Sequence, residues 1–196
     1  KWQIHQTSIK PWPCCRHTHP AIDASIEISR KINGVFPESI AVGVTQATID
    51  VCDNPFPKTE YEAKFSLQHC VAVAILSGRG GFDSFESEAR QFALTFNRKI
   101  TVHNDEKIEQ RYPDAWGANI KAEMKDGSKI NLYRENAKGD PEAPLSPEEM
   151  KAKATMLFTH GRIEEPSKWI EKILCFHKFN SFFSENDFDQ LLNLQA

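Results

Sequence analysis

The sequence predicts an α+β fold, in which a two-layer α/β sandwich is followed by an all-helical C-terminal tail. In the first two thirds of the 196 residues, segments with the two-residue alternation of strands are mixed with segments of helical period. Two of the strand segments are joined by Asp126 and Gly127, a pair typical of hairpin turns. After a linker that contains two prolines, only helical patterns remain. Together these observations favour helices packed on one face of a mixed or antiparallel sheet.

The start of the chain predicts a strand and then a helix. Trp2 and Ile4 lie on one face of an alternating pattern, which is typical of a strand. Pro20 suits the first position of a helix, where its missing N–H leaves no bond unmade, and isoleucines at i, i+4 spacing continue the helical pattern. Asn33 and Gly34 end that helix.

A strand, an extended segment and a central helix follow. Residues 39–51 are rich in β-branched side chains, so we expect a strand that is interrupted near Thr45. Residues 63–65 have an extended pattern. Ser66 then caps a helix that runs to about residue 77 and is apolar on nearly all sides, which predicts a central position in the fold.

The next segments predict one more helix, a strand and the hairpin. A helix after a glycine-rich turn carries an apolar stripe of alanines and phenylalanines. Residues 100–104 alternate as a strand, and residues 118–124 form the first arm of the hairpin, whose second arm carries Ile130 and Leu132. The residues of the apolar stripe are Phe85, Ala89, Phe92, Ala93 and Phe96.

The proline-containing linker marks the expected domain boundary. Ser146 and Glu149 form a capping box that starts a helix, and further helical segments begin at Ser167 and at Ser184. The two expected parts are residues 1–138, an α+β domain, and residues 139–196, the linker and helical tail.

The composition argues against several classes of function. The net charge is -3, with 24 Lys and Arg against 27 Asp and Glu, and the basic residues are scattered, so we expect no nucleic-acid partner. The longest apolar run, residues 70–76, is too short to cross a membrane, and the first residues lack the order of a signal peptide. Five cysteines without a framework spacing indicate free thiols in a reducing compartment. A soluble, cytoplasmic protein is therefore expected.

The stretch "KPWPCCRHTHPAIDA", residues 10–24, concentrates reactive side chains just before a helix. Cys14 and Cys15 suggest a metal site, but zinc sites need a second ligand pair at suitable spacing, and the other cysteines are isolated. A nucleophilic cysteine is favoured by the nearby Arg16 and two histidines, because positive charge lowers the pKa of a thiol. Buried structural cysteine is the commoner alternative.

The same stretch also predicts an anion pocket. The start of the helix at Pro20 offers free backbone N–H groups and the positive end of the helix dipole. Lys10, Arg16, His17 and His19 arrive at this point along a chain that two prolines stiffen. Such a cluster would hold carboxylates, and its histidines would move protons near neutral pH.

A second candidate stretch lies ahead of the central helix. Tyr61 and Lys64 precede the start of that helix and are candidates for substrate contact. Lys64 can instead form a surface ion pair with Glu60 or Glu62, and the sequence leaves both alternatives open.

Three motifs, in this order, resemble the C-terminal half of the MmgE/PrpD family. They are "KPWPCCRHTHPAIDA", "YEAKFSLQHCVAVAILSG" and "KGDPEAPLSPEEMKAK". The resemblance implies a large helical domain, built by an N-terminal half and the last helices, with an α+β lid inserted between them. Residues up to Lys138 resemble the lid, and Ser146 onward resembles the returning helical tail. Because the chain begins at Lys1 and would lack the N-terminal helical domain, we expect a fragment.

The resemblance also implies an activity and a set of site residues. The family acts on small di- and tricarboxylic acids without metal or organic cofactor, usually as a homodimer, in the cleft between the domains. Lys10 and the pair Thr18 and His19 match family motifs, while Cys15 stands where some members have a histidine, a role that His17 can partly take. The expected catalytic residues are Lys10, His17 and His19, and the expected substrate-binding residues are Arg16, Cys15, Tyr61 and Lys64.

Three hypotheses about function follow. The first is the C-terminal part of a lyase or isomerase that acts on a small polycarboxylate and is inactive without its partner domain, which supplies a further histidine. The second is a non-catalytic ligand-binding or regulatory α+β module. The third is a thiol-dependent or metal-bound site at Cys14 and Cys15. The sequence does not choose among dehydration, decarboxylation and epimerisation.

Overall fold

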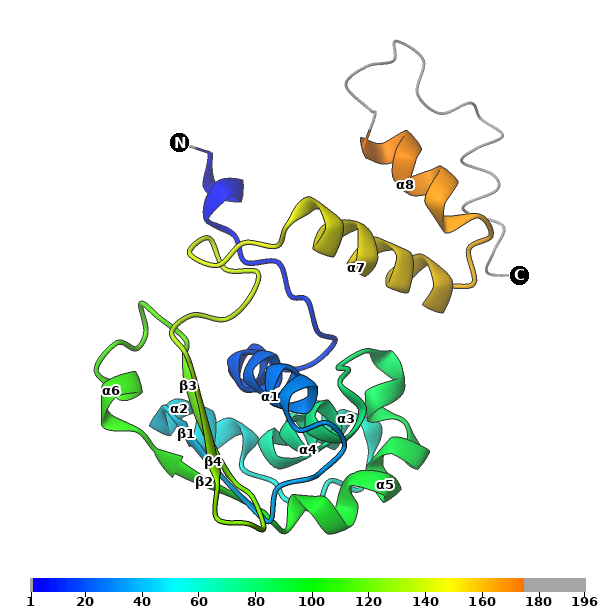
Figure 1. The fold of residues 1–196 in the computed structure, drawn as a ribbon. Helices are drawn as coiled ribbons and strands as arrows, with labels where there is room; N and C mark the ends of the chain where they lie inside the picture. The colour runs from blue at the N-terminus through cyan, green and yellow to red at the C-terminus, as the bar shows by residue number, and fades with distance from the viewer. Residues whose placement is uncertain (1, 175–196) are drawn as a thin grey trace. The chain divides into compact units, whose positions relative to one another are not determined.

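The computed structural model describes residues 2–174 and forms two compact units (Figure 1). The chain divides between Pro144 and Leu145, so residues 139–144 group with the first unit. None of the helices within residues 2–174 is long and apolar enough to cross a membrane. Each unit is described by itself.

A mixed sheet of four strands in the order β2-β1-β3-β4 forms one layer of the described part of the first unit. β1 (Ser39–Val44) pairs in parallel with β2 (Ile100–Asn104). It pairs antiparallel with β3 (Ala118–Glu123), which forms a hairpin with β4 (Lys129–Arg134). The predicted mixed sheet and hairpin are confirmed.

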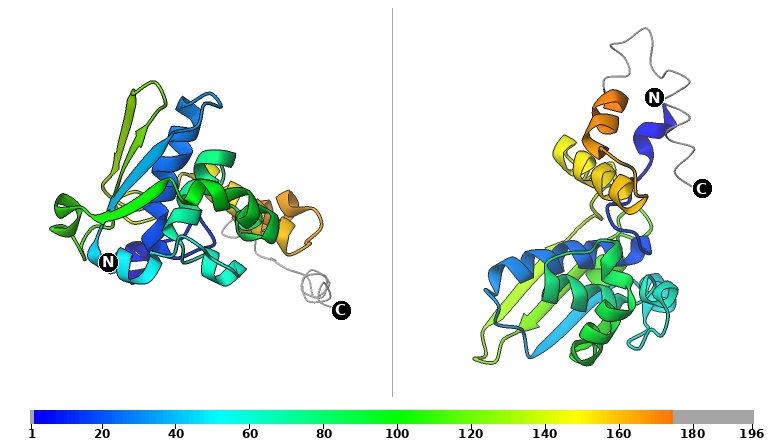
Figure 2. Two further views of the ribbon diagram at one scale, coloured as in Figure 1. Left: turned by 90° about the horizontal axis from the view of Figure 1, so that it is seen from below. Right: turned by 90° about the vertical axis from the view of Figure 1, so that its right-hand side faces the viewer.

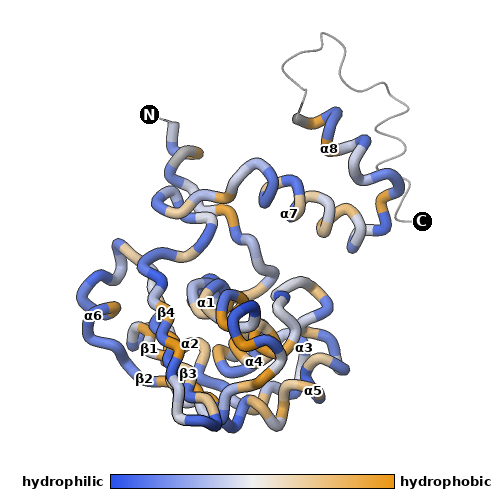
Figure 3. Tube along the Cα trace, in the orientation of Figure 1, coloured by the Kyte–Doolittle hydropathy of each residue, from blue (hydrophilic) through white to orange (hydrophobic). Residues whose placement is uncertain are grey.

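Two helices cover one face of this sheet (Figures 1 and 2). They are α1 (His19–Lys31) and α4 (Leu67–Ser77). Their apolar side chains meet those of the strands, and Figure 3 shows that hydrophobic residues concentrate on α4 and the central strands. This arrangement confirms the α+β class and the central position predicted for the helix after Ser66.

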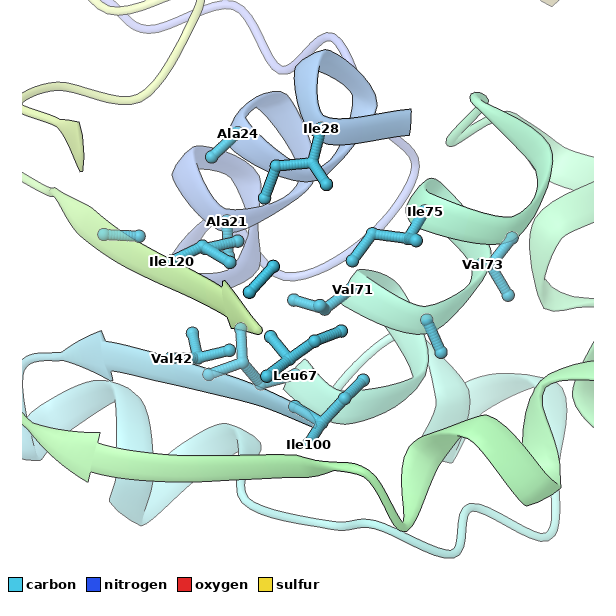
Figure 4. Packing of buried hydrophobic residues seen from close by; sticks show 14 of the residues in the cluster. Ala21, Ala24, Ile28, Val42, Leu67, Val71, Val73, Ile75, Ile100 and Ile120 are labelled. Atoms are coloured by element: carbon cyan, nitrogen blue, oxygen red, sulfur yellow. The ribbon is translucent and has the colours of Figure 1, made fainter. Parts of the chain in front are cut away.

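The core between the two layers is made of small and branched aliphatic side chains (Figure 4). Val42 and Ile120 are register partners on β1 and β3, and both are fully buried. Burying an aliphatic side chain of this size stabilises the fold by about 1.5–3 kcal/mol. The residues of α1 and α4 that face them include Ala21, Ala24, Ile28, Leu67, Val71 and Ile75.

The ends of α4 follow the sequence prediction closely. The Ser66 hydroxyl accepts the backbone N–H of His69 at 3.0 Å, which caps the first turn. Gly78 ends the helix with φ of +68°, a left-handed conformation that glycine adopts without steric cost.

The opening strand predicted from Trp2 and Ile4 is wrong. Residues Gln3–Gln6 form a short 3-10 turn. Trp2 and Ile4 are 79% and 76% exposed, so the alternating pattern has no sheet to pack against. A two-residue alternation this short predicts a strand only where a neighbouring strand pairs with it.

Two further strand predictions give way to helices with capped starts. The second half of the strand predicted over residues 39–51 is the helix α2 (Gln46–Cys52). Residues 63–65, which were expected to be extended, are instead the end of the helix α3 (Glu60–Ala63) and the turn that follows it. Thr45 and Thr59 each accept a backbone N–H three residues later. These caps outweigh the modest strand preference of the residues that follow.

The predicted aromatic stripe is split between two elements. Phe85 belongs to the 3-10 turn Phe82–Phe85, and the helix α5 is Ser87–Asn97. Phe85 and Phe96 are buried, whereas Phe92 is 65% exposed. A short helix, α6 (Glu106–Glu109), follows β2.

The second unit contains two described helices, α7 (Pro147–His160) and α8 (Pro166–Leu174). The predicted capping box is confirmed, because the Ser146 hydroxyl accepts the N–H of Glu149 and the Glu149 carboxylate accepts the N–H of Ser146. The helical segment expected from Ser184 lies outside the described residues, as does Cys175.

Candidate functional site

The candidate site is built on the loop of residues 10–18 that precedes α1. Residues Arg16–Thr18 form a 3-10 turn that runs directly into the helix. The Thr18 hydroxyl donates to the carbonyl of Cys15 at 2.8 Å, and the N–H of Cys15 donates to the carbonyl of Lys64 at 2.9 Å. The loop is therefore held both internally and by the end of α3.

The side chains of Lys10 and His19 both contact one backbone carbonyl oxygen, that of Cys14. The Lys10 ammonium donates to the Cys14 oxygen at 3.2 Å, and His19 Nε2 lies 3.4 Å from the same oxygen. Lys10 is exposed, whereas His19 is 1% exposed. The structure thus brings these two predicted catalytic residues together, with only the lysine accessible to a solute.

Two segments distant in sequence meet beside this loop at Asp23 of α1. The Trp12 indole donates to Asp23 Oδ1 at 2.9 Å, and the N–H of Lys138 donates to Oδ2 at 3.2 Å. Burial raises the pKa of this carboxyl. The N–H of Ile9 also donates to the carbonyl of Gly139 at 2.8 Å. The segment before α1 and the segment after β4 therefore lie side by side.

Gly139 is required for that close approach. Its φ is +92°, and a Cβ added there would lie 1.9 Å from the carbonyl oxygen of Ile9. Any other residue would push the two segments apart.

Arg16 is held by an ion pair and an aromatic ring. Its Nη2 lies 2.6 Å from Oδ2 of Asp140, whose side chain is 5% exposed. The guanidinium carbon lies 4.4 Å from the ring centroid of Trp116. The Nε of Arg16 is buried and has no hydrogen-bond partner among residues 2–174. This cation therefore has a fixed position and direction.

His17 lies against the same tryptophan. The ring centroids of His17 and Trp116 are 4.3 Å apart, and Tyr112 lies 6.5 Å from His17. His17 Nδ1 is 2.9 Å from the hydroxyl oxygen of Thr48 on α2. Burial, and next the charge of Arg16, lower the pKa of His17 below its ordinary value. The imidazole is therefore neutral at neutral pH and can accept a proton.

A narrow hollow, too tight to enclose a water molecule, lies beside His17. It brings together side chains from the loop before α1, the start of α2 and the segment before β3. The lining residues are His17, Pro20, Thr45, Thr48, Tyr112, Trp116 and Gly117.

Several of these residues were not predicted from the sequence. Tyr112 and Trp116 offered one local signal, an aromatic pair four residues apart in a loop. Thr48 and Asp140 offered none, because only the fold places them beside the loop of residues 10–18.

The cysteines divide into buried and half-buried thiols. Cys14, Cys52 and Cys70 are buried and Cys15 is half-buried, and all four are free. A hydrogen bond with the Cys52 thiol, and then the N–H of His17 and the charge of Lys10, lower the pKa of Cys15 to about 6 against the opposing effect of burial. Across residues 2–174, no group of three or more His, Cys, Asp or Glu could hold a metal ion.

Tyr61 and Lys64 lie on and just after α3. The Lys64 ammonium lies 2.7 Å from Glu60, the surface ion pair that the sequence left open. Tyr61 is 71% exposed and stacks on Phe65 with ring centroids 5.0 Å apart. Neither side chain lines the hollow beside His17.

Comparison with known proteins identifies the family. The sequence model of the MmgE/PrpD C-terminal domain matches residues 12–176. The chain is also 23% identical over 191 residues to the cis-aconitate decarboxylase of Mus musculus. That match covers 88% of this chain and 38% of the mouse protein, so the chain spans well under half the length of this relative. The chain belongs to the MmgE/PrpD family.

Proposed function

We propose that this chain is the C-terminal part of a cofactor-independent lyase or isomerase that acts on a small di- or tricarboxylic acid. Membership of the MmgE/PrpD family supports an enzymatic origin, and the mouse relative is a decarboxylase, which is a lyase. The part of that relative that the chain does not cover leaves room for a further domain. On this proposal the chain is inactive alone, and the complete enzyme is a cytoplasmic homodimer.

The observation that carries the proposal is the pairing of a neutral imidazole with a fixed cation. His17 and Arg16 lie on the same Trp116 ring, and His17 and Trp116 line the narrow hollow beside it. Loss of water or carbon dioxide from a polycarboxylate, or inversion at a carbon beside a carboxylate, requires groups that move protons. It also requires positive charge where negative charge develops.

On this proposal, three side chains share the proton transfer, the binding of the substrate and the stabilisation of negative charge. His17 removes a proton from a C–H bond, or returns one, because its lowered pKa keeps a lone pair available. Lys10, which is exposed and, among the described residues, donates to the Cys14 carbonyl, binds a substrate carboxylate. Arg16 contributes a fixed positive charge that favours the developing enolate or carboxylate.

The other predicted residues take smaller parts in the proposal. His19, at 1% exposure, supports the turn at Cys14 that Lys10 also contacts. Cys15, Tyr61 and Lys64 contact substrate only in the complete enzyme, where the partner domain forms the other wall of the cleft.

The test is turnover by a longer protein that includes the upstream sequence. It is offered 2-methylcitrate, citrate, cis-aconitate and iminodisuccinate, and we expect it to convert one of them. Lys10→Met and His17→Gln abolish most of that activity, while His103→Gln, at an exposed position on β2, serves as the matched control. Absence of binding and turnover with every substrate would refute the proposal.

A further inference from the structure

Three side chains form a continuous hydrogen-bonded chain from His17 into α2. His17 Nδ1 is 2.9 Å from Thr48 Oγ1, and Thr48 Oγ1 is 2.9 Å from Thr45 Oγ1. Thr45 Oγ1 also accepts the backbone N–H of Thr48 at 3.1 Å. Both threonines are buried, at 2% and 4% exposure. The first turn of the helix therefore fixes the hydroxyl that contacts the imidazole.

The number of hydrogens restricts how this chain is directed. The hydroxyl of Thr48 has one hydrogen, so it donates either to Thr45 or to His17. If it donates to Thr45, its lone pairs face His17, and the imidazole must donate from Nδ1. If it donates to His17, Nδ1 carries the lone pair and Nε2 carries the hydrogen.

Only the first direction suits a base. With the hydrogen on Nδ1, the lone pair of the neutral ring is on Nε2, the nitrogen that forms no hydrogen bond to a described residue. When Nε2 takes up a proton, both nitrogens carry hydrogen, and Thr48 still accepts from Nδ1. In the second direction the hydrogen bond from Thr48 to Nδ1 is lost when the ring is protonated, because an imidazolium cannot accept a hydrogen bond. The first direction therefore serves both protonation states without rearrangement.

The ring is also held in its plane. Trp116 stacks on one face of His17 with centroids 4.3 Å apart and planes 37° from parallel. A half-turn of the ring about the Cβ–Cγ bond would place Cδ2 where Nδ1 lies and so separate Nδ1 from Thr48.

We propose that Thr48 is a positioning residue that holds the hydrogen of His17 on Nδ1, so that Nε2 is the basic nitrogen. Its catalytic meaning rests on the proposed function, in which His17 moves the proton. The arrangement of the hydrogen itself does not depend on which substrate is used.

The test reads the tautomer directly. In the 15N-labelled chain, the imidazole nitrogens of His17 are observed by NMR at a pH well above its pKa. We expect Nδ1 at the protonated position and Nε2 at the unprotonated position. Thr48→Val keeps the shape and removes the hydroxyl, so the Nε2 signal moves toward the protonated position, and Thr48→Ser restores the original spectrum. Thr101→Val, at an exposed position on β2, leaves it unchanged.

The outcomes separate the two proposals. A wild-type His17 with its hydrogen on Nε2 overturns the positioning role, whatever the variants do. A folded Thr48→Val chain with the wild-type spectrum overturns it as well. In the longer protein, Thr48→Val lowers kcat by at least about tenfold with little change in KM, and Thr48→Ser rescues it. A protein without turnover on any polycarboxylate but with the expected tautomer refutes the function and leaves the positioning role standing.

Discussion

Arg16 and Asp140 form an ion pair, with 2.6 Å between Nη2 and Oδ2, that joins two segments more than a hundred residues apart in the sequence. Asp140 is almost completely buried, while Arg16 is partly exposed. Removing one member of a buried pair leaves an uncompensated charge, which costs more than the pair itself contributes. The bond therefore ties the loop before α1 to the segment that leaves the unit.

We predict that Asp140→Asn destabilises the first unit by about 1–3 kcal/mol, less than a fully buried pair would lose because Arg16 is partly exposed. Urea unfolding measures the change. Glu123→Gln removes the exposed ion pair with Lys129, which is 3.5 Å long, and is expected to cost under about 1 kcal/mol. Equal effects of the two substitutions would contradict the role assigned to Asp140.

Trp116 is expected to control the protonation of His17. Trp116→Leu removes the ring that covers the imidazole, so the burial that lowers the His17 pKa is relieved and the pKa rises toward its ordinary value. NMR titration of the histidine measures this change. Trp2→Leu, at a position 79% exposed, provides the control and leaves the titration where it is.

Two histidines with lowered pKa values, His17 and His69, contribute to the pH dependence of stability, in the same direction as the lowered pKa of Cys15. The unfolded chain takes up these protons first as the pH falls below about 6.5, so protonation favours the unfolded state. The free energy of unfolding therefore decreases from about pH 7.5 to about pH 5.5. His17→Gln reduces this slope, as urea titrations at both pH values will show. A slope that is unaltered in the variant would mean that His17 titrates normally in the folded chain.

Asp23 is expected to hold the two segments that flank the α+β unit. Asp23→Asn replaces one carboxylate oxygen by an amide N–H, so either Trp12 or the N–H of Lys138 loses its acceptor. An unsatisfied buried group costs about 1–3 kcal/mol, and the fluorescence of Trp12 changes with its surroundings. Asp114→Asn, at an exposed position, is the control for both measurements.

Local sequence signals predicted the elements that local chemistry determines. The cap at Ser66, the glycine at 78 and the capping box at Ser146 each appear where the residue types require them. The opening strand failed because strand pairing depends on a partner that the local pattern does not contain. The strand expected past Thr45 failed because the hydroxyl of this residue caps a helix instead.

The candidate site shows the same division. The residue types in the loop of residues 10–18 were enough to predict a candidate site there. The structure places Arg16 and His17 of this loop against the same ring, that of Trp116. Thr48 on α2, Trp116 in the segment before β3 and Asp140 in the segment after β4 contact these two residues. Contacts of this range are set by the register of the sheet and the packing of the helices, which no short motif encodes.

The hydrogen bond between Ile9 and Gly139 brings together the segment before α1 and the segment after β4. A folded segment whose ends meet can be spliced into a surface loop of another protein without stretching either partner, since the host chain is interrupted at only one place. The close contact at Gly139 is what keeps the two ends together. The folded segment between Ile9 and Gly139 thus has neighbouring ends, the geometry that tolerates insertion into a loop, and Gly139 keeps those ends close.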